Sequence, residues 1–162
     1  MQEQNGIKEA ELGRKELLQT EKVIGIIEEI DGMKKNVALE ICSETCHFTI
    51  PLSRMFKKVY TVVMSYELAE EIHEKLKKEG IRNVGIIVAS EPIEIDFKID
   101  LALLSHVLSS QNSKNYLCFA KNAEFVVLVD EKRTDIQFFE GFEVLRSCEL
   151  PLRHMVLKRK RI

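Results

Sequence analysis

Residues 58–90 read KVYTVVMSYELAEEIHEKLKKEGIRNVGIIVAS, and the fold prediction starts from this stretch. Its two ends are apolar runs without strict alternation, which is typical of buried strands. Between them Ser65 stands in an N-cap position, apolar residues recur at helical spacing, and Gly80 follows as a helix stop. A strand, a helix of about 15 residues and a second strand make a βαβ unit, the central unit of the predicted fold.

The residues before this unit predict a short helix followed by strands. Residues 7–20 place several apolar side chains on one helical face. Residues 22–41 read as two strands around a turn at Asp31, because β-branched residues dominate the first strand and apolar residues alternate in the second. A third run ends at Pro51. We therefore expect a small antiparallel β-meander over about residues 22–52.

The residues after the unit predict a short strand at 93–97, a buried helix through about Ser109 and a β-meander over 116–150. The predicted fold class is α+β: a mixed β-sheet with a central βαβ unit, flanking helices and β-meanders at both ends. We expect a single compact domain over residues 1–162, with subdomains 1–56 and 57–162 as the alternative division.

Composition bounds the class of protein. The chain has 162 residues and a formal net charge of −2, which excludes a polyanion-binding signature for the chain as a whole. The N-terminal residues are polar and no apolar run is long enough to span a membrane, so we expect a soluble, cytoplasmic protein. The absence of Trp and the abundance of Lys and Glu favour a thermophile. The cysteines are expected as reduced thiols: Cys42, Cys46, Cys118 and Cys148.

Polar residues follow both strands of the βαβ unit. Ser65, Tyr66 and Glu67 come after the first strand, and Ser90 and Glu91 come after the second. Open α/β sheets bind ligands at the carboxyl ends of their strands, so these five residues form a candidate ligand-binding edge. Two acids disfavour a phosphate and favour a neutral or cationic ligand. The alternative is that Ser65 only caps the helix and Ser90 only makes a turn.

No metal site is predicted. Cys42, Cys46 and His47 are close in sequence, and Cys148 and His154 lie near the end of the chain. Structural zinc needs four ligands, usually from paired CxxC knuckles, and the spacing here supplies no such set. A disulfide between Cys42 and Cys46 would need a tight loop over 43–45. No cofactor is predicted either.

Asp130 and Lys132 follow an apolar run that reads as a strand, in the order Asp-x-Lys. This hairpin resembles the catalytic hairpin of the PD-(D/E)xK nucleases, which pairs an acid on one strand with (D/E)xK at the end of the next. The resemblance implies magnesium-dependent hydrolysis of nucleic acid. It covers about 18 residues, and the expected first acid falls near Asn115, which carries no charge. The alternative is a charged surface turn.

The chain closes on a dense basic run, Lys158, Arg159, Lys160 and Arg161. Such a run suits nucleic acid, an acidic protein surface or the acidic N-terminal part of a second copy in a homo-oligomer. The alternative is a solvated tail. No membrane partner is predicted.

The four histidines lack partners at readable spacing, and no nucleophile–base pair can be named, so no catalytic residue is assigned. The leading hypothesis is therefore a non-enzymatic intracellular binding or regulatory module, associated with nucleic acid through the basic run. The alternatives are a metal-dependent nuclease with a degenerate site and a structural subunit of a larger assembly.

Overall fold

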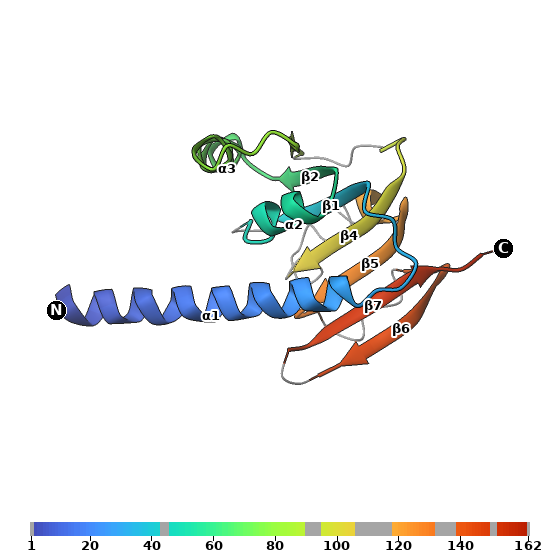
Figure 1. The fold of residues 1–162 in the computed structure, drawn as a ribbon, viewed down its shortest axis with the longest axis horizontal. Helices are drawn as coiled ribbons and strands as arrows, with labels where there is room; N and C mark the ends of the chain where they lie inside the picture. Colours follow the sequence, from blue (N-terminus) through green and yellow to red (C-terminus); the bar gives the residue numbers. More distant parts are fainter. Residues whose placement is uncertain are drawn as a thin grey trace.

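The computed structural model describes residues 2–42, 46–89, 95–105, 118–131, 139–149 and 152–161, and they form one seven-stranded sheet with helices (Figure 1). The strand order is β3-β2-β1-β4-β5-β7-β6. The first five strands are mutually parallel, β7 is antiparallel to β5, and β6 is antiparallel to β7. The strands are β1 Val37–Cys42, β2 Lys58–Val63, β3 Val84–Val88, β4 Ile99–Ser105, β5 Ala123–Val129, β6 Phe142–Cys148 and β7 His154–Arg159.

The predicted βαβ unit is confirmed as β2, helix α3 (Tyr66–Lys78) and β3, with Val63 paired to Val88 in parallel register. Ser65 adopts an extended backbone and its Oγ accepts the Leu68 N–H at 3.2 Å, which is N-cap geometry. Gly80 has a φ of 68°, the left-handed conformation that ends a helix without a Cβ clash. The coarse prediction of a mixed sheet with helices is also confirmed.

The predicted front β-meander is wrong. Residues 22–28 continue a long helix, α1 (Gln2–Glu28), and β1 is flanked by β2 and β4 as a parallel strand. The third run, 46–51, leads into a second helix, α2 (Thr49–Met55). The β-branched residues near 22–27 favour a strand locally, but Val23, Ile26 and Ile27 have helical spacing and are buried together against the sheet.

The predicted buried helix before Ser109 is also wrong, because residues 99–105 form β4 in the middle of the sheet. A strand buried on both faces carries an unbroken apolar run, so periodicity does not separate it from a buried helix. The back β-meander is wrong in part. β5 is parallel to β4, residues 118–120 are helical, and the basic run enters β7 instead of forming a tail.

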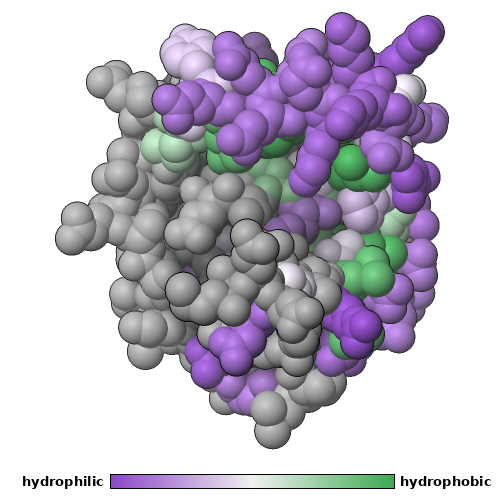
Figure 2. Space-filling model, turned by 90° about the vertical axis from the view of Figure 1, so that its left-hand side faces the viewer, coloured by the Kyte–Doolittle hydropathy of each residue, from purple (hydrophilic) through white to green (hydrophobic). Residues whose placement is uncertain are grey.

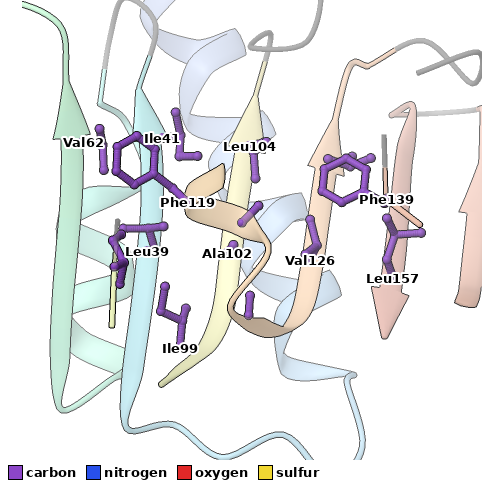
Figure 3. Close-up of a cluster of buried hydrophobic side chains, with 14 of the residues drawn as sticks. Leu39, Ile41, Val62, Ile99, Ala102, Leu104, Phe119, Val126, Phe139 and Leu157 are labelled. Atoms are coloured by element: carbon purple, nitrogen blue, oxygen red, sulfur yellow. The ribbon is translucent and has the colours of Figure 1, made fainter. Parts of the chain in front are cut away.

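Each face of the sheet is covered by its own hydrophobic cluster. Phe48, Leu52 and Ile27 from α1 and α2 pack on one face, and α3 contributes Ile72 and Leu76 to the same side through Val63. On the opposite face short segments replace long helices among the described residues, and Phe119 and Phe139 cover Leu39, Ala102 and Val126 (Figure 3). Both faces of the central strands are therefore buried, while β6 is largely exposed, and chemistry is left to the two edges where the strands begin and end.

Within the described part of the chain, none of the helices combines the length and the apolar character that crossing a membrane requires.

Candidate functional site

The order of the strands defines a switch point between β1 and β4. From β1 the chain proceeds outward to β2 and β3, and from β4 it proceeds the other way to β5. In open α/β sheets, ligands bind beyond the carboxyl ends of the strands at this point. The carboxyl edge faces the left of Figure 1 and the viewer in Figure 2, where hydrophilic side chains gather at the top, over α3, with hydrophobic patches beneath them.

A buried acid lies in β1 beside the switch point. Glu40 is only 3% exposed, and its Oε2 accepts a hydrogen bond from Thr49 Oγ1 at 2.6 Å, while the backbone of Phe48 also bonds to its carboxyl group. Burial raises the pKa of Glu40 to about 7, against the lowering effect of those two bonds. Glu40 thus joins β1 to the start of α2 and fixes the far end of the turn between them.

The cysteine prediction needs a correction at this turn. The prediction that all four cysteines are reduced thiols is wrong for Cys46, which is disulfide-bonded. Cys118 and Cys148 are thiols, as predicted. Among the described residues no group of three or more His, Cys, Asp or Glu side chains is arranged to hold a metal ion.

The predicted ligand edge is placed in part. Ser65 and Glu67 lie at the carboxyl end of β2, and Tyr66 is 78% exposed beside them. The capping role of Ser65 is observed, and Glu67 is exposed in the first turn of α3. Ser90 and Glu91 lie outside the described residues, but β3 is the parallel neighbour of β2, so both strands end at the same edge.

A second group of polar residues lies where β5 ends and β7 begins. Asp130 has a positive φ of 55°, which is uncommon for a residue with a side chain, and its Oδ2 accepts from Gln19 Nε2 of α1 at 3.4 Å. The Asp130 N–H donates to the Arg153 carbonyl at 2.9 Å. His154, 4% exposed, has its Nδ1 2.8 Å from the Leu152 carbonyl, and its Nε2 is buried with no hydrogen-bond partner among the described atoms.

The nuclease geometry is not formed by the described residues. Asp130 follows β5, whose neighbours are parallel β4 and antiparallel β7, instead of standing on one strand of the predicted hairpin. Asn115 and Lys132 lie outside the described residues.

The basic run lies at the opposite edge of the sheet. Lys158 and Arg159 end β7, which is antiparallel, so they stand beside the amino ends of the parallel strands. The Lys158 Nζ lies 5.5 Å from the Phe125 ring centre, and the Arg159 Cζ lies 5.0 Å from the Phe142 ring centre.

Sequence reasoning missed Glu40. In the predicted antiparallel meander, Glu40 would lie on the solvent-exposed face of its strand. In the structure β1 is a central parallel strand, and such strands are buried on both faces. The available signal was one acid inside the otherwise apolar run VALEIC.

No protein-family model matches the chain, and a search of curated proteins also gives no match. Solved structures do match. A SAM-dependent methyltransferase from Aquifex aeolicus has a TM-score of 0.67 at 19% identity, covering 90% of this chain and 91% of that one. Magnesium protoporphyrin IX methyltransferase from Synechocystis PCC 6803, solved with bound SAM, has a TM-score of 0.67 at 15% identity, with 88% and 79% covered. A putative RNA methyltransferase from Pyrococcus horikoshii has a TM-score of 0.67 at 13% identity, with 87% and 81% covered.

These likenesses show the fold, which this chain shares with SAM-dependent methyltransferases. They overturn the interpretation as a non-enzymatic binding or regulatory module and its two alternatives, the nuclease and the structural subunit. The module hypothesis rested on the absence of a nameable nucleophile–base pair, and the nuclease hypothesis rested on the Asp-x-Lys order at residues 130–132. Neither signal reports the strand order, which depends on β1 and β4 pairing as parallel neighbours.

Proposed function

We propose that the chain is an S-adenosylmethionine-dependent methyltransferase whose cofactor binds at the carboxyl edge of β1, β2 and β4. The observation that carries this proposal is the strand order β3-β2-β1-β4-β5-β7-β6, with a single antiparallel β7, in a fold shared over nine-tenths of its length with a SAM-dependent methyltransferase. Fold alone does not make a function, so the proposal also rests on the residues at the edge.

The charges at this edge fit the cofactor. S-adenosylmethionine has a sulfonium, an ammonium group and two ribose hydroxyls, and it has no phosphate. The turn after β1, Cys42–Cys46, contains no glycine, so it is unsuited to cradling a phosphate. The exposed carboxylate of Glu67 is an acceptor of the kind that binds ribose hydroxyls beyond the second strand of a nucleotide-binding unit. A cationic nucleoside suits an edge that would repel a nucleoside triphosphate.

Each part of the edge has a role in the proposal. Glu67 holds the ribose, with Ser90 and Glu91 contributing from the neighbouring strand. Glu40 acts as a positioning residue, because it ties Thr49 and Phe48 to β1 and so sets the end of the turn that meets the ligand. Tyr66, exposed beside Glu67, provides an aromatic surface at the rim.

When bound, the cofactor supplies an electrophilic methyl group. The acceptor atom must lose a proton as it gains the methyl, and a carboxylate receives that proton. We assign this role to Asp130, which is half-buried after β5 and whose Oδ2 accepts from Gln19 Nε2.

We test the cofactor with the purified full chain by calorimetric titration of S-adenosylmethionine and of S-adenosylhomocysteine, and by transfer of a radiolabelled methyl group to total RNA, protein and small-molecule pools. Glu67→Gln should weaken binding roughly tenfold or more, because it removes a charged acceptor. Glu71→Gln, exposed on the same helix, is the matched control and should bind normally. Failure of the wild-type chain to bind either nucleoside would contradict the proposal.

Association with nucleic acid remains part of the proposal, supported by the likeness to a putative RNA methyltransferase and by the basic run Lys158–Arg161. An acidic protein surface, a homo-oligomer and a cytoplasmic location also remain predictions.

A further inference from the structure

Basic side chains gather along the amino edge of the sheet, opposite the proposed cofactor site. The segment before each parallel strand carries at least one: Arg82 before β3, Lys57 before β2, Lys34 and Lys35 before β1, Lys98 before β4 and Lys121 before β5. Antiparallel β7 delivers Arg159, Lys160 and Arg161 to the same edge. All of these except Arg159 are exposed. We call this set the amino-edge row.

The row is too long to be covered by one small ligand, and its length suits an extended polymer. It spans β3, β2, β1, β4, β5 and β7, which are consecutive neighbours in the sheet. At about 4.8 Å between strands, five spacings make a line of roughly 24 Å. Acids lie on this edge as well, and they are fewer: Asp31, Glu79, Asp96, Asp100, Glu124 and Glu140. In a chain of net charge −2 this edge is positive overall.

The part of the row beside β1, β4, β5 and β7 contains a cleft of about 340 Å³. Five basic side chains line it: Lys34, Lys98, Arg159, Lys160 and Arg161. The two acids in its lining are Asp100 and Glu124. Asp100 is buried, and its Oδ2 already accepts the backbone N–H groups of Asn36 at 3.0 Å and Val37 at 2.9 Å. One of the two negative charges is thus engaged by the protein itself.

Arg159 gives the cleft an unfilled donor. Its Nε donates to the Ala123 carbonyl at 3.3 Å and its guanidinium lies over the Phe142 ring, so the group is held in place. Its Nη2 is buried and has no hydrogen-bond partner among the described atoms. Arg159 as a residue is only partly buried and lines the cleft, and a phosphate oxygen is the acceptor that a guanidinium binds best.

We propose that the amino-edge row binds the phosphodiester backbone of a nucleic-acid strand through charge, without reading its sequence. The inference rests on the proposed nucleic-acid association and goes beyond it, because it moves the contact from the last four residues to the whole edge. The row lies about 20 Å from the carboxyl edge, given strands of five to seven residues at about 3.3 Å per residue. A strand held here therefore reaches the methyl-transfer edge only by running along the body, as a polymer can.

The test uses a fluorescein-labelled single-stranded RNA of 20 nucleotides and mixed sequence, measured by anisotropy across a salt series. With about five phosphate contacts the slope of log K against log salt should be near −3.5, at about −0.7 per contact. Lys34→Glu/Lys98→Glu should weaken binding at least tenfold and make the slope shallower by about 1.4. The matched control is Arg14→Glu/Lys22→Glu on α1, which changes net charge equally at exposed positions away from the row.

Four outcomes would overturn the inference: no binding by the wild-type chain in low salt, normal binding by the row variant, equal weakening by the control, or equal competition by polyglutamate, which would indicate an acidic protein partner. Unfolding curves of both variants establish that they are folded. Titration of S-adenosylmethionine into the row variant separates this inference from the proposed function, because cofactor binding should be unchanged. If the wild-type chain binds RNA and does not bind S-adenosylmethionine, the RNA-binding inference stands and the proposed methyltransferase function is contradicted.

Discussion

The two edges of one sheet differ in charge. At the carboxyl edge the charged groups of the proposed site are acids: Glu40 and Asp130 are held by side-chain contacts with α2 and α1, and Glu67 is exposed on α3. At the amino edge the exposed charged groups are mainly Lys and Arg. The comparison teaches that one buried sheet can serve a small cation at one end and a polyanion at the other.

Removal of residues 158–162 should break the amino edge and give the largest effect on stability. Lys158 and Arg159 pair with Phe125 and Phe142, and the Lys160 N–H donates to the Gly141 carbonyl. The loss of these bonds and of two cation–π contacts should cost roughly 3 kcal/mol of unfolding free energy. Urea unfolding measures it. Truncation after Arg159 is the control, with an expected loss below about 1 kcal/mol.

An unchanged urea midpoint after removal of residues 158–162 would contradict this prediction and would indicate that the basic run is a solvated tail.

At the carboxyl edge, Glu40 should make stability depend on pH. Its pKa is raised from 4.5 to about 7 in the folded protein, so the folded state holds this proton more tightly than the unfolded chain. The stabilisation is complete below pH 4.5 and is lost as pH rises through 7, by a total on the order of 3 kcal/mol. Glu40→Gln should flatten this window, because the amide keeps an acceptor for Thr49 and has no charge to bury.

Urea unfolding at a series of pH values measures the Glu40 effect, with Glu71→Gln, an exposed acid on α3, as the control. A wild-type slope retained by Glu40→Gln would assign the pH dependence to other groups.

Ser65→Ala should give the smallest effect, about 1 kcal/mol, through loss of the N-cap bond to Leu68. Ser65→Asp should restore most of it, since aspartate also caps helices. Thermal unfolding compares the two. If Ser65→Ala also abolishes the thermal shift given by S-adenosylmethionine while Ser65→Asp keeps it, the capped turn belongs to the cofactor site. Equal stability of the two variants would contradict a stabilising role for the Ser65 N-cap.

The βαβ unit could be predicted because its signals are local: Ser65 before the helix, Gly80 after it, and apolar runs on both sides. The place of β4 could not, since Ile99–Ser105 becomes a strand by pairing with β1, a segment some 60 residues earlier in the chain, and with β5 on its other side. For the candidate site, the edge rule predicted that Ser65 and Glu67 follow a strand at the carboxyl edge, and they lie there, but their role stays a prediction. Glu40 depended on knowing that β1 is central. The amino-edge row was missed for the same reason, because six segments far apart in sequence must first be set side by side.

Helix α1 has 27 residues, so it is about 40 Å long. It runs opposite to the parallel strands and extends well past the carboxyl edge, with its N-terminal end at the left of Figure 1. The described residues that bury it, Val23, Ile26 and Ile27, all lie in its last two turns. These three residues therefore anchor α1 to the body of the protein, and the turns before them project from it. Gln19 lies one turn before these residues, so its Nε2 meets Asp130 Oδ2 beside the place where α1 is anchored, and the end of β5 is tied to the base of the projecting helix.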